Sequence, residues 1–322
     1  MHHLLDKLSG KGKAKESHYP NASPPQWTPA VEHSHTYGKY EDTTFDEYKE
    51  AERFCARHPV QRPRLLPSDI TERLSLEGCK SWGMRLPSSP RFKGRVESGI
   101  DKGGAGVIKI VTDRTCKDVC IFSDLPIMAG LYDIKGKQGV YYEVVIRKME
   151  GIIAIGNSCS KSAVSLLLMQ FKIGTACLPY PDWRLPGWNR LSVGLHLDDF
   201  RKFYENPDGG RDYETHGLLK RISSGDAIGF GYEFASSSAF FTYNGVRLPK
   251  AFSGIYVPRD RYDVYAAIGV EGDNVFEVNF GTDVFKWKEG NDWAWRVEGH
   301  IGSFASSSGG GGDDLPSYQE AL

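Results

Sequence analysis

Residues 239–248 constrain the fold of this chain more than any other segment. Their sequence is Ala-Phe-Phe-Thr-Tyr-Asn-Gly-Val-Arg-Leu, in which Asn244 and Gly245 separate two runs of alternating apolar and polar residues. Asn-Gly readily supplies the two positive-φ positions of a type I′ turn, whose twist matches that of antiparallel strands. We therefore predict a β-hairpin whose strands each bury one face in a core.

Five further runs are rich in β-branched and aromatic residues and are bounded by glycines and charged turns, as strands are. They cover residues 107–111, 141–146, 226–232, 264–270 and 275–280. No helical pattern separates the later runs, which favours an antiparallel sandwich over an α/β fold. Glycine accounts for 36 of the 322 residues, which fits many short strands joined by turns. We predict an all-β sandwich over residues 95–298.

A short helical flank is expected before the sandwich. Thr44 begins a capping box that predicts a helix over residues 45–57. Asp69 is the predicted cap of a second helix over residues 70–77, which a glycine then ends. We expect residues 39–94 to pack on the main body as this flank.

The two ends of the chain have the composition of disordered segments. Residues 1–38 hold five of the nine histidines and show no hydrophobic periodicity, so we expect a disordered arm. Residues 299–322 begin with a Gly- and Ser-rich linker and end in a short acidic peptide. A linker that leads to such a peptide is typical of a presented recognition motif.

Composition excludes several classes of function. With 40 basic and 41 acidic residues the net charge is -1, whereas a general nucleic-acid binder carries a basic surplus. No stretch approaches the roughly 20 apolar residues that span a bilayer, so we expect no membrane span. The six cysteines are scattered without the paired spacing of a zinc site, and we expect free thiols in a reducing cytosol.

Motifs of catalysis are missing from the sequence. It contains no Gly-x-Ser-x-Gly, no P-loop and no His-Glu-x-x-His. His196 and His216 are expected to be ordinary polar loop residues. We therefore expect no enzyme activity, no cofactor and no metal.

Five ordered motifs resemble those of SPRY domains. Residues 225–232, 240–245 and 278–281 have the sequences Gly-Asp-Ala-Ile-Gly-Phe-Gly-Tyr, Phe-Phe-Thr-Tyr-Asn-Gly and Val-Asn-Phe-Gly. Upstream, Tyr-Tyr-Glu-Val at 141–144 and Arg-Leu-Pro-Gly-Trp at 184–188 resemble two more family motifs. The resemblance covers about residues 95–290 and implies a SPRY-type sandwich that binds proteins.

This chain resembles one group of SPRY proteins in more detail. Residues 179–187 are similar to fungal endosomal and vacuolar SPRY adaptors, which recruit a WW-domain HECT ubiquitin ligase to membrane-protein cargo. Those adaptors carry short Pro-Tyr motifs, and Leu315, Pro316 and Tyr318 fit that pattern. The resemblance implies a cytoplasmic adaptor that associates with endosome or vacuole membranes. Family members usually begin with a transmembrane helix, which this sequence lacks.

Candidate cargo contacts lie in the loop that carries this resemblance. SPRY sandwiches bind partners with loops at one end, and exposed aromatic residues and arginines often dominate binding. By resemblance, the candidate residues are Tyr180, Trp183, Arg184 and Trp188. The alternative is that this loop is a structural corner with Trp188 in the core.

Residues 157–174 interrupt the family pattern. Removing these 18 residues, equivalent to 54 nucleotides, joins Ile-Ala-Ile-Gly to Thr-Ala-Cys-Leu-Pro-Tyr, an ordinary family-like strand and loop. We hypothesise a retained intron. The alternative is a genuine insertion, in which residues 165–171 would form an apolar flap beside the binding loops.

Two other functions compete with the adaptor. Arg-Leu-Pro-Gly-Trp also resembles SPRY scaffold subunits of Ran-binding or histone-methyltransferase type complexes. Those scaffolds carry helical oligomerisation modules after the sandwich, whereas about 25 residues follow it here. A carbohydrate-binding sandwich is a third class, supported by analogy of fold alone.

Overall fold

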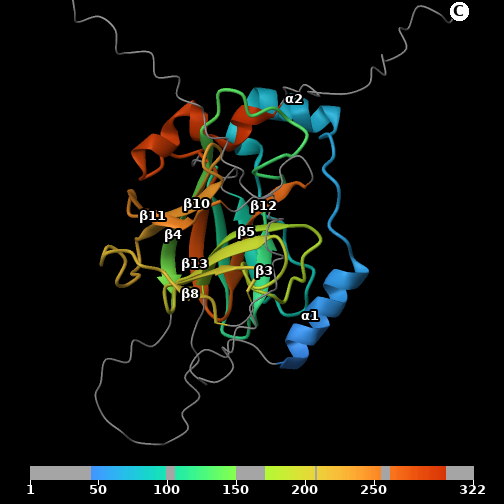
Figure 1. The fold of residues 1–322 in the computed structure, drawn as a ribbon, viewed down its shortest axis with the longest axis vertical. Helices are drawn as coiled ribbons and strands as arrows, with labels where there is room; N and C mark the ends of the chain where they lie inside the picture. Colours follow the sequence, from blue (N-terminus) through green and yellow to red (C-terminus); the bar gives the residue numbers. More distant parts are fainter. Residues whose placement is uncertain (1–44, 99–105, 150–170, 207–208, 255–261, 302–322) are drawn as a thin grey trace, which may run out of the picture.

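The computed structural model describes residues 45–98, 106–149, 171–206, 209–254 and 262–301. Within these ranges two antiparallel sheets, of seven and six strands, pack against each other (Figure 1). The predicted all-β antiparallel sandwich is therefore confirmed. The expected disordered arm and the C-terminal linker and motif lie outside the described residues.

The seven-stranded sheet is built from strands of both halves of the chain. Its members in spatial order are β1 (Gly94–Ser98), β2 (Ile108–Thr112), β13 (Asn274–Asn279), β4 (Gly139–Met149), β9 (Ala227–Glu233), β10 (Ser238–Tyr243) and β11 (Val246–Phe252). The six-stranded sheet consists of β3 (Val119–Phe122), β12 (Val264–Val270), β5 (Phe171–Cys177), β6 (Ser192–His196), β7 (Arg201–Tyr204) and β8 (Arg211–Asp212). Strands distant in sequence thus lie side by side in both sheets.

The hairpin between β10 and β11 has the predicted turn. Asn244 and Gly245 have φ values of 49° and 84°, as a type I′ turn requires. Alternation then places Phe241 in the main core between the sheets and Phe240 on the opposite face. Burial of both faces distinguishes this sandwich from one with a solvated outer side.

Each outer face is covered by its own aromatic cluster. On the seven-stranded sheet, Tyr141 and Phe240 pack against Phe285, Trp287 and Trp295, which follow β13. The last two belong to the segment that forms three short 3-10 helices, Lys288–Asn291, Trp293–Trp295 and Val297–His300. On the six-stranded sheet, the connection between β5 and β6 provides the cover. The folded body thus extends to the last of these 3-10 helices.

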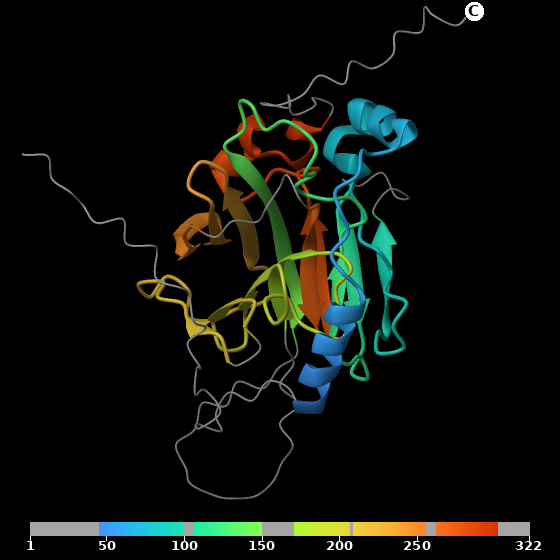
Figure 2. The ribbon, with the colours of Figure 1, turned by 45° about the vertical axis from the view of Figure 1, so that its right-hand side comes forward.

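Two α-helices lie at opposite ends of the sandwich. Helix α1 (Phe45–Arg57) has the predicted bounds, and α2 is Ser68–Glu77, two residues longer at its start than predicted. Pro67 is the N-cap of α2, so the expected Asp69 cap is wrong: Asp69 lies in the first turn instead. Figures 1 and 2 show α1 beside the lower end of the six-stranded sheet, with an extended segment leading up to α2.

Strand β5 corrects the predicted boundary of the insertion. Its first four residues, 171–174, belong to the stretch 157–174, yet they pair with β12 and β6. Phe171 is buried, and its ring centroid lies 4.7 Å from that of Phe276 in the core. The alternative of an apolar flap is therefore wrong for Phe171. Residues 157–170 lie outside the described ranges.

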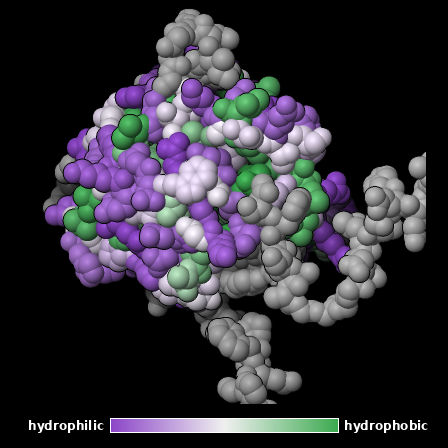
Figure 3. Space-filling model, turned by 90° about the horizontal axis from the view of Figure 1, so that it is seen from above, coloured by the Kyte–Doolittle hydropathy of each residue, from purple (hydrophilic) through white to green (hydrophobic). Residues whose placement is uncertain are grey.

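The face of the described body that is seen from above is mostly hydrophilic (Figure 3). Seen from above, over α2 and the 3-10 helices, hydrophobic residues form small separate groups among polar ones (Figure 3). No helix in the described ranges has the length and apolar character needed to cross a bilayer. The cysteines of these ranges, Cys55, Cys79, Cys116, Cys120 and Cys177, are free thiols.

Candidate partner-binding site

The connection between β5 and β6 folds back against the outer face of its own sheet. At Gly187, where φ is 94°, an added Cβ would lie 2.4 Å from the Cβ of Phe203. At Gly194 in β6, it would lie 2.1 Å from the carbonyl oxygen of Pro186. Only glycine permits so close an approach of backbone to backbone. The loop is therefore pressed onto the sheet, and its inward side chains are excluded from water.

Three of the four candidate contact residues are buried by this packing. Tyr180 donates a hydrogen bond from its hydroxyl to the carbonyl oxygen of Leu185 at 2.7 Å. Arg184 has no exposed surface; its Nε donates to Oδ1 of Asn189 at 2.9 Å, and its guanidinium lies 4.5 Å from the Trp188 ring centroid. Burial lowers the pKa of Arg184. The alternative of a structural corner with Trp188 in the core is confirmed.

Trp183 differs from its neighbours because it stays half-buried at the surface. Its ring meets that of Phe54 in α1 edge to face, with centroids 5.5 Å apart and planes at 81°. Such a geometry suits the quadrupoles of two aromatic rings. Direct contact of this loop with a partner therefore stays a prediction that depends on Trp183. Tyr180, Arg184 and Trp188 support the corner from inside.

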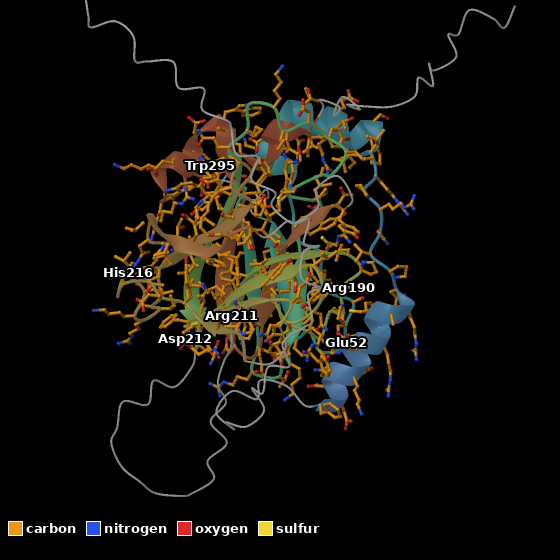
Figure 4. The ribbon with its side chains drawn as sticks, in the orientation of Figure 1. Glu52, Arg190, Arg211, Asp212, His216 and Trp295 are labelled. Carbon is orange, nitrogen blue, oxygen red and sulfur yellow. The ribbon has the colours of Figure 1, made fainter. Side chains whose placement is uncertain are left out.

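Helix α1 is held on the loop by polar contacts that sequence reasoning missed. Arg190 donates from its guanidinium to the carbonyl oxygens of Cys55 and His58, at the C-terminal end of α1. Nδ2 of Asn189 donates to Oε1 of Glu52 at 3.1 Å. Figure 4 shows Glu52 and Arg190 on the same side of the molecule. A cation at a helix C-terminus offsets the negative end of the helix dipole.

A groove of about 510 Å³ runs between α1 and Trp183, and we call it the α1 groove. Its lining residues are Asp46, Lys49, Glu50, Arg53, Phe54, Arg57, His58 and Trp183. The i, i+4 spacing of Arg53 and Arg57 places both arginines on one face of α1. That spacing was visible in the sequence, but the partner surface supplied by the loop was not.

A cluster of charges is enclosed at the beginning of β5. Lys172 is fully buried, with Nζ 3.6 Å from Oδ1 of Asp198. Burial raises the pKa of Asp118 to about 7, although the charge of Lys172 acts in the opposite direction. Burial likewise raises the pKa of Glu271. One ammonium group thus lies among three carboxyl groups.

The two histidines expected in loops differ in their surroundings. His196 lies in β6, where it is buried with its ring centroid 3.8 Å from that of Phe203, so a loop position is wrong for it. Burial lowers its pKa well below the usual value. His216 is exposed, 3.8 Å from a carboxylate oxygen of Glu214, as expected for a polar loop residue. His196 is therefore a neutral imidazole that packs in the interior against Phe203.

Other predicted features fall outside this site. Leu315, Pro316 and Tyr318 lie beyond the described residues. Within the described ranges, no group of three or more His, Cys, Asp or Glu side chains is placed to hold a metal ion. The geometry of the site is that of a contact surface made of arginines and aromatic rings.

Two antiparallel sheets with covered outer faces define the class of this protein as an antiparallel β-sandwich. Residues 139–283 match the family model of the SPRY domain, from the start of β4 to just after β13. This segment is therefore similar to SPRY domains over 145 of the 322 residues. Strands β1 to β3 and the closing 3-10 helices complete the sandwich outside the matched segment.

Curated fungal proteins share this region. The chain is 34% identical to Protein ssh4 of Sclerotinia sclerotiorum over 133 residues, which are 41% of this chain and 24% of that protein. It is 33% identical to a SPRY domain-containing protein of Schizosaccharomyces pombe over 133 residues, 41% of this chain and 32% of that one. The match thus spans about a quarter to a third of these relatives' length.

A solved structure also matches. It is a crystal structure of a human SPRY domain, with 20% sequence identity and a TM-score of 0.37, covering 61% of this chain and 96% of that one.

Proposed function

We propose that this chain is an adaptor for a ubiquitin ligase. The SPRY sandwich binds a protein partner, including membrane-protein cargo, and the segment Leu315-Pro316-Ser317-Tyr318 recruits a WW-domain HECT ubiquitin ligase. Its place of action is the cytoplasmic side of endosome or vacuole membranes. The observation that carries this proposal is the combination, in one chain, of a SPRY domain and a Leu-Pro-x-Tyr segment behind a Gly-rich stretch.

The chemistry of the tail supports recruitment of a WW domain. Proline-rich segments favour an extended polyproline II backbone, so they lose little conformational entropy when they dock in an aromatic groove. Pro316 would fill that groove and the ring of Tyr318 a second pocket. A Gly- and Ser-rich tether raises the local concentration of the ligase at bound cargo without a rigid interface. Weak affinity at the motif is then sufficient.

The buried corner weakens the main alternative. Similarity of Arg-Leu-Pro-Gly-Trp to scaffold subunits of Ran-binding or histone-methyltransferase complexes depends on Arg184 and Trp188. Both side chains are buried and hold the loop on the sheet. Resemblance at such positions reflects a shared fold and does not identify a partner. The same holds for the adaptor resemblance at residues 179–187, so the adaptor is favoured over the scaffold by the Leu-Pro-x-Tyr segment alone.

Fluorescence anisotropy tests the ligase arm of this proposal. A labelled peptide of residues 309–322 is titrated with WW domains of a HECT ubiquitin ligase, next to a Tyr318→Ala peptide. We expect saturable binding with Kd on the order of 10 μM, or about −7 kcal/mol, and at least a tenfold loss in the variant. Equal titration curves for the two peptides, or no binding by either, would remove the main support for the adaptor.

A further inference from the structure

The floor of the α1 groove is a row of aromatic rings. The Phe54 ring centroid lies 5.5 Å from that of Trp183 and 4.5 Å from that of His58. Phe54 and Trp183 are half-buried, so part of each ring remains accessible from the groove. Aromatic side chains held in place by packing are frequent anchors of protein interfaces, because they bury a large area at low entropic cost.

Charge is unevenly distributed along this groove. Asp46, Lys49 and Glu50 line it in the first half of α1 and carry both signs of charge, whereas Arg53 and Arg57 line it near the end. Among the described residues, neither Arg53 nor Arg57 forms an ion pair with a carboxylate, and both are exposed. Unpaired guanidinium groups beside an aromatic floor suit carboxylates, which arginine binds in bidentate geometry.

The C-terminal end of a helix normally repels anions, but at the end of α1 this repulsion is reduced by hydrogen bonds from Arg190. The last carbonyl groups of a helix carry partial negative charge. Here Arg190 donates to the carbonyl oxygens of Cys55 and His58 from the loop side. The negative end of the dipole is thereby offset next to Arg53 and Arg57. The repulsion that a carboxylate meets at this end of the groove is thereby reduced.

We propose that the α1 groove binds an acidic segment of a partner protein that carries an aromatic or large aliphatic side chain. The apolar side chain would lie against Phe54 and Trp183, while neighbouring carboxylates pair with Arg53 and Arg57. This inference rests on the proposed role of the SPRY sandwich as a partner-binding module and names the chemistry of the partner. It makes no use of the C-terminal motif.

Peptide selection on the full chain tests this inference. A random dodecapeptide library displayed on phage is selected against the immobilised chain, and the most enriched peptide is synthesised with a fluorescent label. We expect it to be acidic, with an aromatic or large aliphatic residue, and to bind in the micromolar range. Enrichment of peptides without acidic residues would overturn the inference.

Charge-reversal variants then locate the bound peptide. Arg53→Glu with Arg57→Glu, and separately Trp183→Ala, should each weaken its binding at least tenfold. Arg73→Glu with Lys80→Glu is the matched control, since both residues are exposed in or just after α2 and the change in net charge is the same. The affinity of this control variant for the peptide should stay within twofold of that of the original chain. Thermal unfolding of each variant verifies the fold.

The outcomes separate this inference from the proposed function. If the acidic peptide keeps its affinity in the Arg53 and Arg57 variant, the groove is not its site and the inference fails. WW-domain binding by the tail must survive that same variant, because the tail motif is a separate segment. Loss of WW binding with retained groove binding would count against the ligase arm alone.

Discussion

Asp118, directly before β3, shows how burial controls a single charge. Its Oδ1 is buried and has no hydrogen-bond partner among the described residues. Burial raises its pKa to about 7; nearby charges on Lys172 and Arg91 lower it, and those on Glu271 and Glu47 raise it. The folded protein therefore binds the proton of Asp118 more tightly than the unfolded chain, whose carboxyl titrates near pH 3.8.

This shift has a defined effect on stability. A raised carboxyl pKa gives stability that is complete below pH 3.8 and is lost as pH rises through about 7. We expect Asp118 to remove about 2 kcal/mol of unfolding free energy between pH 5 and pH 8. Urea unfolding at both pH values should show that Asp118→Asn loses less unfolding free energy between pH 5 and pH 8 than the original chain does. Asp212→Asn, at an exposed carboxylate, is the control; equal pH dependence in all three proteins would contradict this account.

Single residues of the candidate site were only partly predictable. The sequence of the loop indicated Tyr180, Trp183, Arg184 and Trp188 as candidate partner contacts, but aromatic residues and arginines are common both in interfaces and in covered corners. What decides between the two is the close contact at Gly187, which brings the loop onto Phe203. That contact joins residues 16 positions apart in the sequence (203 minus 187) and leaves no local pattern there.

At the scale of an element, two segments of the sequence are candidates for the beginning of strand β5. Its first residues, Phe171-Lys172-Ile173-Gly174, have an upstream counterpart in Ile153-Ala154-Ile155-Gly156. Gly174 is needed because a Cβ there would lie 1.8 Å from the carbonyl oxygen of Val193, and the counterpart also ends in glycine. Ala154 would replace the buried Lys172 with a small apolar side chain. Either segment can therefore supply the start of this strand.

Deletion of residues 157–174 tests this equivalence. We expect the shortened full chain to unfold cooperatively at a temperature at least equal to that of the original, since it no longer buries an ammonium group. Deletion of residues 158–174 is the control: it shifts the counterpart by one position and turns its side chains to the opposite faces. An uncooperative transition in the first variant, or equal stability of the two, would contradict the prediction.

The retained intron remains our proposal for the origin of this stretch. Equivalence of the two segments supports it, because splicing would leave the register of β5 unchanged. Sequencing of mature transcripts decides the matter. A message that codes through residues 157–174 would establish a genuine insertion.

The elements that were predicted are those with a strong local signal in the sequence. The sequences of helix α1 and of the β10–β11 hairpin carry clear signals of a helix start and of a turn between alternating strands, and both elements were predicted. Strands β3, β5 and β6 are buried on both faces, because the loop covers the outer side of their sheet. They therefore lack the period of two that marks a half-exposed strand. The N-terminal strand β1 is short and charged.

The molecule as a whole is larger than its matched segment. Helix α1 covers the loop of the six-stranded sheet, and the final 3-10 helices cover the opposite outer face. The described residues form one packed body, and in the sequence a Gly- and Ser-rich stretch stands between it and the C-terminal peptide. Partner binding by the body and ligase binding by the tail can then vary independently, as the proposed adaptor requires.

Isothermal titration calorimetry of the full chain with a WW domain of a HECT ubiquitin ligase tests the central claim most directly. Binding should occur with one WW domain per chain and should be lost in Tyr318→Ala. Trp27→Ala, which changes the Pro-Pro-Gln-Trp segment of the N-terminal arm, is the matched control and should bind as the original chain does. Retained binding in Tyr318→Ala, or its absence in the original chain, would contradict recruitment of the ligase through this tail.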